Sequence, residues 1–113
     1  MTRVSVVREE GHIRQLTVSG HAGYAEAGQD IVCAAVSILT TTCVNALSSV
    51  AGVEPIVTQD ERTAKVVVAL PRQLSQTERR DAETVMETAL QGFRDLSGEY
   101  PSFCTILDRR KSP

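Results

Sequence analysis

The chain has 113 residues, of which 42% are hydrophobic and 23% charged, and its formal net charge is −2. This length predicts one domain, residues 1–113, with a single hydrophobic core. The slightly acidic balance argues against binding nucleic acid through its phosphates, and the opening sequence MTRVSVVREE predicts no signal peptide.

The start of the chain predicts two paired strands. Residues 2–8 are rich in β-branched side chains, and Gly11 suits a turn. The sequence then runs on as a second strand, with Leu16 and Val18 on one face. Residues 20–29 contain three glycines, so we expect a deformable loop there.

An uncharged segment follows, for which we predict a helix from Ile31 to about Val50. Asp30 suits the N-cap position, and Gly52 and Pro55 are stop signals beyond the helix. A membrane span is the alternative, but the segment contains many polar residues: Ser37, Thr40, Thr41, Thr42, Asn45, Ser48 and Ser49. We instead expect a helix buried between a sheet and a partner, which predicts a homodimer and no membrane contact.

The second half of the chain predicts a hairpin, a helix and a last strand. The hairpin covers residues 54–70, with its turn near 59–62 and Ala64 on the same face as Val66, Val68 and Leu70. Ser75 and Glu78 form a capping box before a helix with a clear apolar stripe, and Gly98 suits the position after its end. The expected fold is α+β, a two-layer ββαββαβ arrangement with an antiparallel sheet and two main helices.

The three cysteines are Cys33, Cys43 and Cys104, and no pair has the spacing of metal ligands. We therefore expect no metal, no cofactor and reduced thiols, as in a cytoplasm. Cys43 in mid-helix and Cys104 in mid-strand are most simply core residues.

Cys33 differs from the other two because it falls in the expected first turn of a helix. Free amides and the positive end of the helix dipole favour a thiolate there, and the amides of Cys33 and Ala34 could hold a developing oxyanion. His21, on the preceding loop, could act as general base and then as general acid. Packing of Cys33 in the core and a solvated His21 are the alternatives.

Neighbouring residues are open to two interpretations each. Asp30 could orient His21 or simply cap the helix. Ser37, one turn beyond Cys33, could line a pocket or fill a buried helix face. Tyr24 could line a substrate groove or lie on a surface loop.

The stretch GHAGYAEAGQDIVCAAVS resembles the signature of the ribosomal-processing cysteine proteases, the Prp family. The residues that match are Gly20, His21, Ala22, Asp30, Ile31, Val32, Cys33, Ala34, Ala35 and Ser37. The resemblance implies a Cys33–His21 dyad peptidase that is a homodimer in the bacterial cytoplasm. It also implies the substrate, which is the N-terminal extension of the twenty-seventh protein of the large ribosomal subunit, cut after an aromatic pair.

Two other classes of protein remain open. One is a non-catalytic, ribosome-associated dimeric module that binds a peptide while Cys33 only packs. The other is a thiol redox switch, which is disfavoured because no second cysteine lies at C-x-x-C spacing.

Overall fold

The structure is a computed structural model that describes residues 1–20 and 27–109, with side chains described from Ile31 onward in the second range. It contains two helices and a five-stranded sheet. The elements are, in chain order, β1 (Thr2–Glu9), β2 (His12–Ser19), α1 (Ala27–Ser49), β3 (Ile56–Asp60), β4 (Lys65–Ala69), α2 (Gln76–Glu99) and β5 (Cys104–Asp108).

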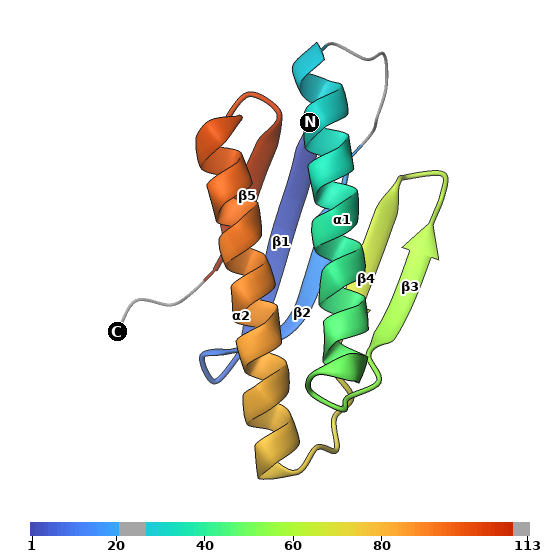
Figure 1. The fold of residues 1–113 in the computed structure, drawn as a ribbon, viewed down its shortest axis with the longest axis vertical. Coiled ribbons are helices and arrows are strands. Elements are labelled where there is room, and N and C mark those ends of the chain that lie inside the picture. The colour runs from blue at the N-terminus through green and yellow to red at the C-terminus, as the bar shows by residue number, and fades with distance from the viewer. Residues whose placement is uncertain (21–26, 110–113) are drawn as a thin grey trace.

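Both helices lie on the same face of the sheet, so the molecule has two layers (Figure 1). The strand order across the sheet is β3-β4-β2-β1-β5, with the β3–β4 hairpin at one edge and β5 at the other. The core lies between the helices and the sheet, and its largest fully buried side chains include Phe93, Leu47, Met86, Leu90 and Leu16. The α+β class and the ββαββαβ order are confirmed.

One pairing makes the sheet mixed instead of wholly antiparallel. β1 pairs with β2, β2 with β4, and β3 with β4 in antiparallel fashion, but β5 runs parallel to β1. β5 follows β4 only after the long crossover through α2, and a crossover connection of this kind permits a parallel strand.

The observed ends of β3, β4 and α2 differ from the sequence-based prediction. The β3–β4 turn covers residues 61–64, and Ala64 lies in it with a φ of 51° instead of in the strand. Gly98 lies within α2, whose C-cap is Tyr100. The capping box of Ser75 and Glu78 is confirmed, with both of its hydrogen bonds present.

α1 begins at Ala27, so the prediction that Asp30 is its N-cap is wrong, and so is the prediction that residues 27–29 belong to a loop. Asp30 lies in the first turn of the helix, where an acidic residue is also favourable to the helix dipole. Residues 21–26 of the predicted loop lie outside the described residues.

α1 packs on the core with only part of its surface. Val32, Cys43 and Leu47 are buried, whereas Ile31 and Ile38 are 54% and 62% exposed. By length and composition alone, Ile31–Ser49 could also cross a membrane, a test that core helices of soluble proteins pass as well.

A charged cluster fastens β5 to the rest of the sheet. The Arg8 side chain is 5% exposed and donates hydrogen bonds to both carboxylate oxygens of Asp108, each at 2.9 Å, and to Glu87 of α2 at 2.9 Å. Asp108 and Glu87 raise the pKa of the Arg8 guanidinium above its ordinary value through these hydrogen bonds. Arg8 therefore joins β1, β5 and α2 through one buried side chain.

Candidate active site

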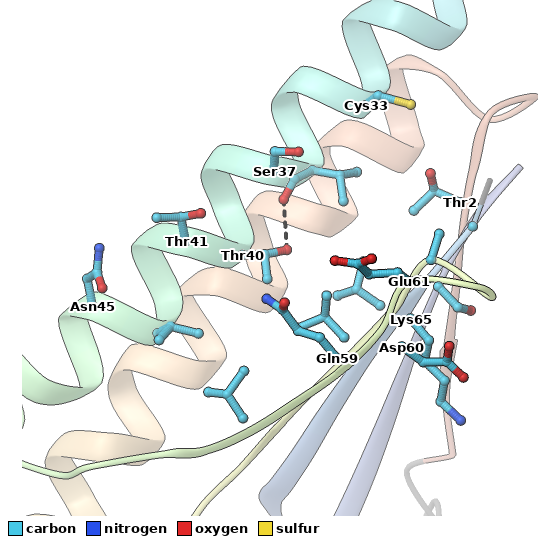
Figure 2. A pocket seen from close by; sticks show the side chains of 18 residues that line it. Thr2, Cys33, Ser37, Thr40, Thr41, Asn45, Gln59, Asp60, Glu61 and Lys65 are labelled. Atoms are coloured by element: carbon cyan, nitrogen blue, oxygen red, sulfur yellow. Dashed lines mark hydrogen bonds between the residues drawn. The ribbon is translucent and has the colours of Figure 1, made fainter. Parts of the chain in front are cut away.

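A groove of about 510 Å³ lies between α1 and the β3–β4 hairpin. α1 forms one wall with Cys33, Ser37, Thr41 and Asn45, and β3 with the following turn forms the other with Val57, Gln59 and Glu61 (Figure 2). The apolar side chains of Val18 and Val66 come from the neighbouring strands β2 and β4. The groove exists because β3, at the edge of the sheet, has no helix packed directly over it, and all five of its residues are exposed.

Cys33 lies near one end of the groove and is half-buried. Figure 2 shows its sulfur pointing away from the axis of α1 toward the side of the groove where Thr2 lies. Thr2 is 5% exposed and lines the groove at the start of β1. A thiol in this place is accessible to a molecule that enters the groove.

The other two cysteines are enclosed in the core. Cys43 is 3% exposed, and its sulfur lies 3.6 Å from the sulfur of Met86. Burial raises the pKa of the Cys43 thiol to about 11, and burial also raises the pKa of Cys104. A neutral thiol that is shielded from solvent is a poor nucleophile, so Cys33 is the cysteine suited to chemistry.

The observed start of α1 changes the position of Cys33 within the helix. Cys33 lies six residues after Ala27, in the second turn of α1, so the prediction that it occupies the first turn is wrong. An α-helix leaves unpaired only the first four N–H groups at its start, because each later N–H donates to the carbonyl four residues earlier. The amides of Cys33 and Ala34 therefore take part in the helix and are not available to an oxyanion.

Polar side chains continue from Cys33 along α1. Ser37, Thr41 and Asn45 follow at steps of four residues, are exposed, and line the groove. Figure 2 shows the four side chains along one side of the helix. The hydroxyl of Thr40, by contrast, donates to the carbonyl of Val36 at 2.7 Å.

Gly20 brings the end of β2 against the start of β1. Its φ is +151°, and a Cβ at this position would lie 2.7 Å from the Cα of Thr2 and 2.8 Å from the carbonyl oxygen of Met1. No other residue fits there without a backbone shift, so Gly20 sets the path of the chain as it leaves the sheet beside the groove.

The remaining predicted site residues have different outcomes. His21 and Ala22 lie outside the described residues, as does Tyr24, and for Asp30 the structure describes the backbone alone. Ala34 is exposed and does not belong to the described residues that line the groove. Ser37 and Gly20 do line the groove beside Cys33.

Sequence reasoning missed Thr2, Asn45, Gln59 and Glu61. Asn45 could have been found by extending the spacing of Cys33, Ser37 and Thr41 by one more step of four. Alternation places Val57 and Gln59 on one face of β3, and Glu61 follows directly after the strand, but nothing local indicates that this face lies opposite α1.

The sequence matches known proteins along nearly its whole length. Residues 1–105 match the sequence model of a family described as "Cysteine protease Prp". A relative from Bacillus subtilis, named ribosomal processing cysteine protease Prp, is 31% identical over 88 residues, which are 78% of this chain and 79% of the relative. A relative of the same name from Mycoplasma pneumoniae is 33% identical over 97 residues, or 86% and 89% of the two chains.

Solved structures share the fold. SMU.848 from Streptococcus mutans superposes with a TM-score of 0.83 at 30% identity, over 96% of this chain and 93% of that one. The ribosomal processing protease Prp from S. aureus, in complex with a substrate peptide, superposes with a TM-score of 0.82 over 96% and 100% of the two chains. At 24% identity the latter shows the fold alone. Together with the sequence matches, these findings show that the chain belongs to the Prp family of cysteine proteases and is a cysteine peptidase.

Proposed function

We propose that Cys33 is the nucleophile of this peptidase and that His21 is its general base. The observation that carries the proposal is that Cys33 lines the groove between α1 and the hairpin, whereas Cys43 and Cys104 are buried. His21 belongs to the segment that joins Gly20 to α1, and Gly20 lines the same groove.

The proposed reaction is acyl transfer in two steps. The His21 imidazole accepts the proton of the Cys33 thiol, and the sulfur attacks the carbonyl carbon of the scissile peptide bond. When the C–N bond breaks, the imidazolium gives its proton to the leaving amine, and a thioester remains on Cys33. Water, deprotonated by His21, then attacks the thioester, which releases the new carboxylate and restores the thiol.

Supporting roles fall to residues beside this pair. Because the amides of Cys33 and Ala34 are committed to the helix, we assign the hydrogen bond to the peptide beside Cys33 to the hydroxyl of Ser37. Asp30 and Ala22 belong to the sequence signature around this pair, and we propose supporting roles for both. Gly20 allows the close approach to Thr2 from which the connection starts.

The proposed substrate is the N-terminal extension of the twenty-seventh protein of the large ribosomal subunit, cut in the bacterial cytoplasm. The names of the relatives, which refer to ribosomal processing, support this substrate. The shape of the groove supports an extended peptide. From Cys33 to Asn45, α1 rises about 18 Å, which is the length of about five extended residues.

We further propose that the protein acts as a homodimer, without nucleic acid or membrane as a partner. Support comes from the exposed apolar residues Ile31 and Ile38 on α1, since such a face is usually covered in soluble proteins. A second copy of the chain is the partner that the resemblance to the family implies.

The direct test is to incubate the protein with the ribosomal precursor and to sequence the new N-terminus. We expect one cut in wild type, no cut with Cys33→Ala, and a loss of about 10²- to 10⁴-fold with His21→Ala. Cleavage by pure Cys33→Ala would contradict the nucleophile, and unchanged turnover in His21→Ala would mean that another group is the base. A protein that binds the precursor without cutting it would instead be a peptide-binding module.

A further inference from the structure

The wall of the groove that faces α1 carries a carboxylate that the proposed reaction does not use. Glu61 is the first residue of the β3–β4 turn and continues the face of β3 on which Val57 and Gln59 lie. Val57 pairs with Val68, which is 1% exposed and faces the core, so this face of β3 is the one turned toward the helices. Figure 2 shows the polar ends of Gln59 and Glu61 on the side of α1.

Two charged residues of the hairpin near Glu61, Asp60 and Lys65, differ from Glu61 in direction and in partners. In Figure 2 the carboxylate of Asp60 points away from α1, whereas that of Glu61 points toward it. The Asp60 Oδ1 accepts a hydrogen bond from the backbone N–H of Arg62 at 3.0 Å. Asp60 is also the cross-strand partner of Lys65, and both residues line the groove, so their opposite charges together add no net charge to it. Glu61 makes no ion pair with any residue in the described part of the chain.

The facing wall of the groove contributes no charge of its own. Its polar side chains beyond Cys33 are the hydroxyls of Ser37, Thr40 and Thr41 and the amide of Asn45. Asp60 and Lys65 also line the groove, but their charges are opposite, so Glu61 leaves the described lining with one net negative charge. A cationic group is the complement of such a site.

We propose that Glu61 is a specificity-determining residue that binds a lysine or arginine side chain of the peptide substrate. The β3–β4 turn and the N-terminal part of α1 lie toward the same end of the molecule, so the basic residue belongs close to the scissile bond (Figure 1). This inference rests on the proposed role of Cys33, because Cys33 marks where the scissile bond lies. Glu61 is exposed, so the ion pair contributes modestly to affinity and weakens with salt.

The test uses binding, which does not depend on turnover. The full chain with Cys33→Ala is titrated with a fluorescent peptide that covers the extension of the ribosomal precursor. In this reference peptide every basic residue is replaced by glutamine. A set of derivatives then carries a single lysine, moved one position at a time. We expect one position at which lysine tightens binding about three- to fivefold, and we expect Glu61→Gln to abolish that gain while leaving the neutral peptide unchanged.

Two further variants separate a specific contact from general charge. Glu61→Lys should prefer a peptide with glutamate at the selected position, which a merely structural role of Glu61 would not produce. Asp60→Asn removes the same charge from the adjacent residue and retains an acceptor for the Arg62 N–H, so it should keep the preference for lysine.

The inference is overturned if lysine tightens binding at no position, or if Glu61→Gln retains the gain in affinity from lysine. It is also overturned if Asp60→Asn loses as much of that gain as Glu61→Gln does. A failure of the proposed function has a different signature. In that case wild type leaves the ribosomal precursor uncut, whatever the binding experiment shows.

Discussion

A Cβ on Gly20 would lie 2.7 Å from the Cα of Thr2, closer than such atoms pack. The two residues join the end of β2 to the start of β1, and Thr2 lines the groove beside Cys33. The first strand of the chain thus forms part of the site, through a contact that tolerates no side chain.

Gly20→Ala should destabilise the protein and reduce cleavage together. The substitution places a methyl group against backbone atoms at a φ of +151°, and such strain costs about 1–3 kcal/mol of unfolding free energy. Urea titration and peptide cleavage on the same sample would measure both effects. Gly98→Ala is the control, because it lies in α2 with open space at the Cβ position and should slightly stabilise the fold.

The three thiols should react with iodoacetamide in a fixed order. At neutral pH, Cys33 should be alkylated first because it lines the groove, whereas Cys43 and Cys104 are buried and burial raises the pKa of each. Peptide mapping by mass spectrometry after short exposure reports the order. Equal labelling of the three thiols in the folded protein would contradict the proposal that Cys33 is the nucleophile. Labelling in urea supplies the reference for the unfolded chain.

Stability should fall in alkaline solution because of Cys43. Its pKa rises from an ordinary value of 9.0 to about 11 in the folded protein, so between these values the unfolded chain loses a proton that the folded chain keeps. The unfolded state is then favoured as pH rises, by up to about 1.4 kcal/mol per pH unit. Urea titrations from pH 8 to about 11 should show this slope, and Cys43→Ala should lessen it relative to wild type.

Ile38→Glu should convert the proposed dimer to a monomer. Ile38 is 62% exposed on α1, so the charge costs little in a single chain but is buried without a partner in a dimer. Light scattering should report a mass near twice 12.2 kDa for wild type and near 12.2 kDa for the variant. Leu107→Glu, at a residue 51% exposed on β5, is the matched control and should leave the mass unchanged. A monomeric wild type would overturn the dimer proposal.

The local patterns of the sequence predicted most of the elements because each depends on nearby residues. The capping box of Ser75 and Glu78 and the apolar stripe of α2 are contained within a few turns of chain. The prediction that α1 starts at Ile31 with Asp30 as its N-cap is wrong because an acidic residue is favourable both as an N-cap and in the first turn. Ala27 and Gln29 also form helices readily, so the local sequence does not decide between the two starts.

The groove could not be predicted because it depends on distant segments. Cys33 was singled out by its own surroundings in the sequence, but Glu61 and Gln59 face α1 only because β4 pairs with β2 and carries β3 to the edge of the sheet. In the same way, the sequence indicated a last strand without indicating that it joins β1 in parallel. Both features arise from strand order, which no window of neighbouring residues contains.

The parallel pairing of β1 with β5 also bears on when the enzyme can become active during its synthesis. Thr2 pairs with Cys104 and Val6 with Asp108, so the two strands are separated by about a hundred residues of chain. Contacts over such a separation form slowly, because the chain between them must lose its freedom first. The β1–β2 hairpin can form as soon as it emerges from the ribosome. The other edge of β1 remains unpaired until nearly all of the protein has been translated. A nascent peptidase therefore carries Cys33 long before the sheet behind the groove is complete, and cleavage is expected to begin only after the last strand has docked.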